Sequence, residues 1–167
     1  YSKKILNKLK KTYKKKKIYY LPFGYDQLIH RKNKNKIKNY DISFVGTADQ
    51  KRFDIINKLS NYKVIVGGDG WNKYNLSKNI KYIGNVNPVN FSKIISQSKI
   101  SLNILREQNY KSHNMKTFEI TSMGGLMLTK RTVEQNNFFP ENFSCFMYDN
   151  SNELLNKIKK ILNNYNK

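Results

Sequence analysis

The stretch SHNMKTFEITSMGGLMLT, residues 112–129, carries the strongest structural pattern of this chain. Its polar first half predicts a short helix over residues 117–123, which ends at paired glycines and runs directly into an apolar strand. A helix at the strand ends of an α/β sheet presents its first backbone N–H groups to the ligand crevice. We therefore expect a βαβ architecture with a crevice at the start of this helix.

The rest of the chain from Tyr40 onward supports this architecture, because short apolar runs alternate with helical patterns. The expected strands are residues 42–45, 63–66, 80–83, 100–104, 126–129 and 145–148. The other expected helices are residues 50–59, 88–97 and 151–163, the last capped by Asn150 or Ser151. The pattern predicts an α/β fold with a doubly wound, mostly parallel, Rossmann-like sheet over residues 40–167.

Residues 1–39 have a different composition. Residues 3–17 read as a Lys-rich helix with one apolar face, residues 18–26 as a short strand closed by a Pro and Gly turn, and residues 31–39 as an exposed loop. The helix has three interpretations: it lies on a membrane, packs on a domain absent from this sequence, or is a solvated helix. Since the sequence starts at Tyr1 without an initiator Met, we expect a fragment of a longer protein.

The composition bounds the classes of protein to consider. A length of 167 residues and 38% apolar content fit one globular domain. The net charge of +21 suggests an anionic partner, but only four of the 32 basic residues are Arg, which disfavours nucleic acid. The alternative is that AT-rich codons, which encode Lys, Asn and Ile, explain much of the positive charge. With one cysteine, Cys145, and no apolar run near membrane-span length, we expect a cytoplasmic protein, with peripheral contact to an anionic membrane or an acidic glycan as the alternative.

Loops after the expected strands are candidate ligand contacts, because ligands of such sheets bind at the carboxyl ends of the strands. Gly46 and Thr47 would let the backbone approach a phosphate, and Arg52 follows in the next helical turn, where it either meets a bound anion or is simply solvated. The spacing excludes a P-loop. Residues 67–70 are interpreted as a turn, whereas residues 82–86 lie where a nucleotide base could stack.

The strongest constellation is Asn114, Lys116, Thr117 and Glu119. Lys116 and the helix N-terminus would hold a diphosphate, and Glu119 would accept the hydroxyls of a ribose. The alternative is a solvated carboxylate on a helix whose C-cap is formed by residues 124–125.

The two histidines give no convincing general base. His30 falls in the basic linker, and His113 beside the site is either a contact to the donor sugar or an exposed loop residue.

Five segments in this order resemble the C-terminal, donor-binding domain of GT-B glycosyltransferases, in particular the CgeB-like group. They are LPFGYD at residues 21–26, SFVGT at 43–47, YIGN at 82–85, NMKTFE at 114–119 and FMYD at 146–149. Two positions depart from the pattern. Lys116 stands where Arg is usual, and Lys111 stands where many retaining members have the first Glu of a Glu-x7-Glu pair, which leaves the stereochemical outcome open.

The resemblance implies a metal-independent, hexosyltransferase-like enzyme that binds a nucleotide-diphosphate sugar of UDP or GDP type. It implies no cofactor, an acceptor of unknown identity, and an N-terminal acceptor domain that this chain lacks. No catalytic residue is assigned. The expected donor contacts are Gly46, Thr47, Arg52, Tyr82, Gly84, Asn85, His113, Asn114, Lys116, Thr117 and Glu119.

Two other functions remain open at this point. A sugar-nucleotide epimerase could share the GT-B fold and the ribose-binding Glu. A basic nucleic-acid-binding module would explain the charge alone, and we rank it lower.

Overall fold

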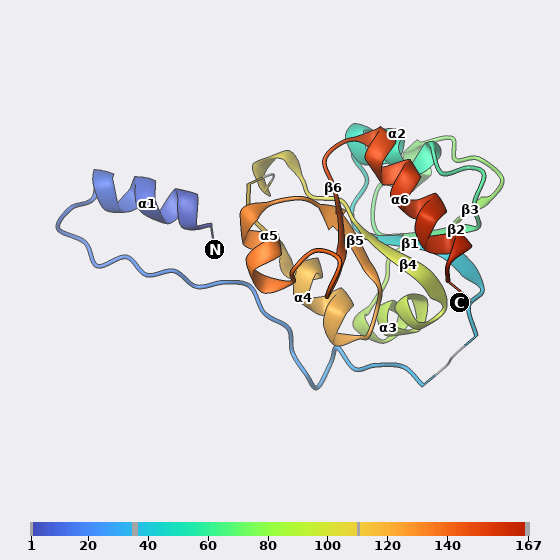
Figure 1. The fold of residues 1–167 in the computed structure, drawn as a ribbon, viewed down its shortest axis with the longest axis horizontal. Coiled ribbons are helices and arrows are strands. Elements are labelled where there is room, and N and C mark those ends of the chain that lie inside the picture. Colours follow the sequence, from blue (N-terminus) through green and yellow to red (C-terminus); the bar gives the residue numbers. More distant parts are fainter. Residues whose placement is uncertain (1, 35–36, 110, 166–167) are drawn as a thin grey trace.

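Six parallel strands form the centre of the protein (Figure 1). The computed structural model describes residues 2–34, 37–109 and 111–165, and in these residues the strand order is β3-β2-β1-β4-β5-β6. The strands are β1 (Tyr40–Val45), β2 (Val64–Gly67), β3 (Ile80–Tyr82), β4 (Ser98–Asn103), β5 (Met127–Lys130) and β6 (Phe146–Tyr148). The predicted doubly wound, Rossmann-like sheet is confirmed, and it is parallel throughout.

Helices connect the strands, and most of them start at a polar N-cap. They are α1 (Lys3–Thr12), α2 (Gln50–Asn57), α3 (Pro88–Ser96), α4 (Met115–Ser122), α5 (Val133–Phe138) and α6 (Ser151–Asn163), with 3-10 turns η1 (Trp71–Lys73) and η2 (Glu107–Asn109). For α2 to α6, the N-cap side chain accepts a hydrogen bond from a first-turn N–H. These N-caps are Asp49, Asn87, Asn114, Thr132 and Asn150.

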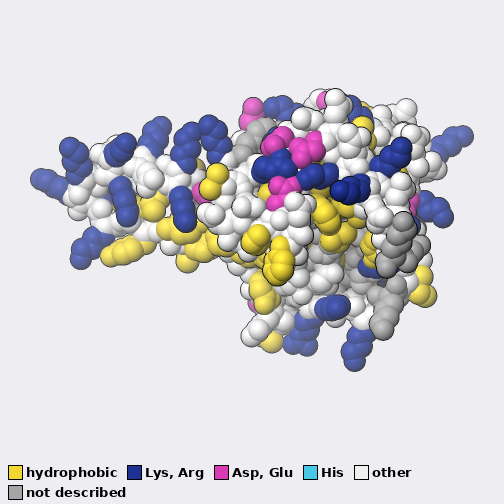
Figure 2. Space-filling model, in the orientation of Figure 1, with side chains coloured by type: hydrophobic (Ala, Val, Ile, Leu, Met, Phe, Trp, Pro, Cys, Tyr) yellow, Lys and Arg dark blue, Asp and Glu magenta, His cyan; other side chains and the backbone are white. Residues whose placement is uncertain are grey.

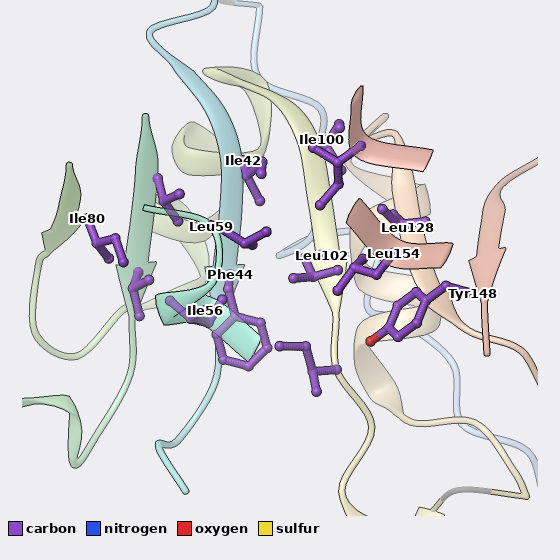
Figure 3. Close-up of a cluster of buried hydrophobic side chains, with 14 of the residues drawn as sticks. Ile42, Phe44, Ile56, Leu59, Ile80, Ile100, Leu102, Leu128, Tyr148 and Leu154 are labelled. Atoms are coloured by element: carbon purple, nitrogen blue, oxygen red, sulfur yellow. The ribbon is translucent and has the colours of Figure 1, made fainter. Parts of the chain in front are cut away.

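The alternating side chains of the strands build one core on each face of the sheet. The larger core packs strand residues such as Ile42, Phe44 and Leu102 against Ile56 of α2 and Leu154 of α6 (Figure 3). The opposite core is built from α3, α4 and the other faces of β5 and β6. Because helices cover both faces of the sheet, a ligand can approach the central strands only at their two ends.

The structure differs from the sequence predictions at several points. The helix predicted over residues 3–17 ends at Thr12. Residues 18–26, all of them described, form no strand, because this apolar run has no neighbouring strand with which to pair. Helix α5 was not predicted. Residues 35 and 36 of the predicted exposed loop, and residue 110 of the loop before α4, lie outside the described residues.

An ion network ties the end of β5 to the last helix. The Arg131 guanidinium donates to Glu141 Oε1 at 2.8 Å and to Glu153 Oε1 at 2.9 Å, and it also contacts Asp149. Lys157 on α6 pairs with both glutamates. Hydrogen bonds from Arg131 lower the pKa of Glu141 and bring the pKa of Glu153 to about 2.

The backbones of three loops are in direct contact at the carboxyl edge of the sheet. Gly46 N–H donates to Gly67 O, and Gly68 N–H donates to Gly84 O, each at 2.8 Å. Gly68 has φ +122°, and a Cβ added there would lie 2.4 Å from Gly46 O. Gly84 has φ +73° but open space around its Cβ position. At Gly68 only glycine allows the close approach of the Gly46 carbonyl. At Gly84 glycine is favoured only because the backbone has a positive φ.

The ion network predicts an acid-dependent loss of stability. A carboxylate whose folded-state pKa is depressed stabilises the protein above its ordinary pKa, near 4.5, and this contribution is lost as the pH falls towards about 2. We expect Glu153→Gln to lower the free energy of unfolding at pH 7 by about 1–2 kcal/mol and to flatten its acid dependence. Denaturant titrations across the acid range measure both, and Glu107→Gln, on an exposed pair with Lys51, is the control. An unchanged acid profile in Glu153→Gln would contradict this role.

The loop contacts predict a difference between two glycine substitutions. Gly84→Ala meets only the strain of a positive φ and should reduce the free energy of unfolding by about 1 kcal/mol. Gly68→Ala adds a clash with the Gly46 carbonyl and should reduce it by about 3 kcal/mol or more. Thermal or denaturant unfolding of the two variants gives the comparison. Equal losses would show that the two backbones can separate freely.

Candidate functional site

The crevice lies where the strand order reverses. β1 and β4 are adjacent, and their following connections lead to opposite sides of the sheet, which is the place where ligands bind in open α/β folds. A cavity of about 410 Å³ opens there, lined by residues 49–52 after β1 and residues 104–108 after β4. The topology therefore locates the candidate site at this edge.

Arg52 holds together the two loops that border this crevice. Its side chain is nearly buried, with Nη1 donating to Thr47 O and Nη2 to Ile104 O, each at 2.8 Å. Its guanidinium also lies 5.4 Å from the centre of the Phe44 ring. The simply solvated interpretation of Arg52 is wrong. Two carbonyls account for its position at the start of α2, and contact with a bound anion stays a prediction.

The other predicted contacts on the first three loops lie along the same edge. Thr47 and Asn85 are exposed, and the backbones of Gly46 and Gly84 take part in the loop contacts described above. Tyr82 donates its hydroxyl to Gly68 O at 3.1 Å, so its side chain supports the loop after β2. Gly67 ends β2, and the turn predicted at residues 67–70 is confirmed for residues 68–70, where Gly68 and Gly70 have positive φ.

The N-terminus of α4 is locked onto the end of β4. Asn114 Oδ1 accepts from Thr117 N–H at 3.2 Å, and Thr117 Oγ1 accepts from Asn114 N–H at 3.4 Å, which is a capping box. The Asn114 amide also exchanges hydrogen bonds of 3.0 and 3.1 Å with Asn103. Sequence reasoning missed Asn103, although a polar residue ending an apolar strand was a usable signal. The amide pair fixes the direction of the α4 dipole.

Glu119 is a buried carboxylate between two cationic or titratable groups. It is 5% exposed, so its interpretation as a solvated helix residue is wrong. Lys116 Nζ lies 2.8 Å from Oε2, and His30 Nε2 lies 3.6 Å from Oε1. The Lys116 ammonium also lies 4.0 Å from the centre of the Phe91 ring. The structure thus brings Lys116, Glu119 and His30 together, whereas the diphosphate role of Lys116 and the ribose role of Glu119 stay predictions.

His113 is a structural joint at the start of α4. Its side chain is fully buried, so the exposed-loop interpretation is wrong. Nδ1 lies 2.9 Å from Glu134 Oε2, and Nε2 accepts from Phe23 N–H at 3.2 Å, which assigns the neutral tautomer with its proton on Nδ1. Burial lowers the pKa of His113, although Glu134 acts in the opposite direction. Both ring nitrogens therefore have protein partners, and contact with a donor sugar stays a prediction.

Residues 23–32, here called the strap, run along α4 and cover Glu119. Phe23 is bound at His113, and His30 faces Glu119. The His30 carbonyl accepts from Ser122 Oγ at 3.4 Å, and the Arg31 carbonyl accepts from Ser92 Oγ. These contacts join positions up to 92 residues apart in the sequence. The strap therefore lies against the buried Glu119 carboxylate.

The described residues offer neither a metal site nor a membrane-spanning helix. Within residues 2–34, 37–109 and 111–165, no group of three or more His, Cys, Asp or Glu side chains is placed to hold a metal ion. In the same described part of the chain, no helix has the length and apolar character needed to cross a membrane.

Similar folds occur among solved structures at low sequence identity. Sucrose-phosphate synthase from Thermosynechococcus elongatus has a TM-score of 0.67 and 14% identity, over 95% of this chain and 47% of that one. TarM from S. aureus has a TM-score of 0.68 and 15% identity, over 98% of this chain and 36% of that one. T4 phage β-glucosyltransferase has a TM-score of 0.60 and 19% identity, over 94% of this chain and 52% of that one. This chain thus spans about half or less of their length, and the likeness shows a shared fold.

Family membership comes from sequence. No curated protein matches the chain. The family model described as glycosyl transferase-like, however, matches residues 50–167, which is more than two thirds of the chain and includes all of α4 and every residue of the crevice lining except Asp49. The fold, an all-parallel sheet flanked by helices, is that of a GT-B glycosyltransferase domain. This chain belongs to the glycosyl transferase-like family.

Proposed function

We propose that this chain is the donor-binding domain of a metal-independent glycosyltransferase of the CgeB-like group. It binds a nucleotide-diphosphate sugar of UDP or GDP type, and the hexosyl group passes to an acceptor held by an N-terminal domain outside this sequence. The family match supports transfer over epimerisation. The similar structures include T4 phage BGT in complex with UDP-glucose and TarM in complex with UDP, which supports a nucleotide-sugar donor.

The observation that carries the proposal is the buried carboxylate of Glu119 beside Lys116 on the helix that follows β4. A buried carboxylate without a ligand function is unfavourable unless it is paired, and here the partners come from one lysine and from the displaceable strap. The two oxygens of Glu119 suit the adjacent hydroxyls of a ribose. In the bound state Lys116 turns towards the diphosphate, where it acts together with the N-terminus of α4.

The remaining residues shape and line this site. The exposed edge formed by Thr47 and Asn85, with the open space beside Gly84, accommodates the base and the phosphates. Arg52 positions the loops after β1 and β4 through their carbonyl groups. Fixed cations and a helix dipole stabilise the negative charge of the leaving diphosphate, so the proposal requires no metal.

The first test is calorimetric titration with UDP and GDP. We expect saturable binding of one nucleotide, with the same affinity in the presence of a chelator. Glu119→Gln removes the charge but keeps the size, and should weaken binding by about tenfold to a hundredfold through lost charged hydrogen bonds. Asp54→Asn, on the exposed side of α2, is the matched control and should bind as the wild type does. Equal affinities for wild type and Glu119→Gln would remove the ribose role of Glu119. Binding of DNA or RNA with a steep salt dependence, and of no nucleotide, would favour the nucleic-acid module.

The strap generates a second test. Because the ribose and His30 compete for Glu119, His30→Ala should tighten nucleotide binding by about threefold to tenfold. Leu28→Ala, an exposed position on the strap, is the control and should leave the affinity unchanged. The same titration measures both variants. Weaker binding by His30→Ala would mean that His30 supports the bound donor instead of competing with it.

A further inference from the structure

We propose that α1 and the segment after it form a second binding surface, which inserts into the interface of a membrane that contains anionic lipids. This surface is separate from the donor crevice, and its function does not depend on the proposed transferase activity. The argument rests on charge, on an uncovered apolar stripe and on the way in which α1 is attached.

The charge around α1 has a single sign. Nine lysines fall within residues 3–17, and the first acidic residue of the chain is Asp26. All nine are exposed, and no residue of α1 itself is buried. The lysines are Lys3, Lys4, Lys8, Lys10, Lys11, Lys14, Lys15, Lys16 and Lys17. Such a concentration of ammonium groups fits an extended anionic surface.

The opposite side of α1 is apolar and uncovered. Ile5, Leu9 and Tyr13 recur every four residues, which places them on one stripe, and they are 49%, 37% and 53% exposed. Beyond the helix, Tyr19 and Leu21 are also apolar and each about four-fifths exposed. Figure 2 shows hydrophobic side chains along the lower side of this arm and Lys side chains above them. A nucleic acid would leave this apolar stripe unused, whereas a membrane interface uses both sides.

The attachment of α1 leaves the stripe accessible. Glu134 Oε1 accepts a hydrogen bond from Lys3 N–H at 2.8 Å, and Ser2 is buried beside it. The other oxygen of Glu134 binds Ser112 and His113, so the first turn of α1 is anchored to the joint at the start of α4. The rest of the helix projects away from the sheet (Figure 1). A helix of this length, about 15 Å, can lie flat at the headgroup level.

Vesicle co-sedimentation of the full 167-residue chain tests the charge requirement. We expect binding to phosphatidylcholine vesicles with about 30% phosphatidylglycerol, no binding to pure phosphatidylcholine, and release at about 1 M salt. The triple variant Lys4→Gln, Lys8→Gln, Lys11→Gln should bind on the order of 100-fold more weakly, at about fivefold per lysine. The control Lys58→Gln, Lys78→Gln, Lys159→Gln has the same net charge with exposed lysines elsewhere and should bind like the wild type. Equal binding to neutral vesicles, or equal weakening by the control, overturns the proposal.

A fluorescent reporter tests insertion of the apolar stripe. The only tryptophan, Trp71, is fully buried, so Tyr13→Trp adds an indole whose change in emission is attributable to α1. We expect its emission to shift to the blue on anionic vesicles, and Leu9→Ser to weaken binding by about tenfold. Binding without a shift, and without an effect of Leu9→Ser, would mean charge adsorption alone and would overturn insertion. Since α1 has no buried residue, these variants leave the core intact.

Discussion

Parallel pairing of β1 with β4 is the constraint on which the rest of the structure depends. Ile42 pairs with Ile100 and Phe44 with Leu102, and these four side chains pack in the larger core. Right-handed crossovers from this pair must lead to opposite sides of the sheet, so α2 covers one face and α4 the other. The last helix, α6, packs on the same core as α2, and α3 packs on the same core as α4. The crevice is the direct result, and Arg52 keeps its two borders in contact.

The position of α4 connects this crevice to the N-terminal residues. The amide pair of Asn103 and Asn114 sets the start of the helix against β4, while His113 binds Phe23 and Glu134 beside it. Through Glu134, the same joint holds the first turn of α1. The strap and the basic arm thus share one attachment point at the start of α4.

Much of the fold could be predicted from the sequence, because its strands are short apolar runs, several of them ending at glycine, and the caps of α2, α3, α4 and α6 are Asn or Asp. Helix α5 was missed because VEQNNF has no apolar period, and its start depends on the Thr132 cap. Residues 18–26 were assigned to a strand because an apolar run looks the same with or without a pairing partner. At the site, Lys116 and Glu119 were found because they are three residues apart on one helix. Arg52, Glu119 and His113 also have partners that lie 52, 89 and 90 residues away, which are Ile104, His30 and Phe23, and only the folded chain brings these together.

The central claim is that Glu119 and the N-terminus of α4 form a nucleotide-sugar site beneath the strap. A crystal structure of this chain with UDP tests it most directly. The account predicts the ribose hydroxyls within hydrogen-bond distance of the Glu119 carboxylate, His30 displaced from Oε1, and the diphosphate at Lys116 and the start of α4. UDP bound elsewhere, with Glu119 still paired to His30, would contradict it.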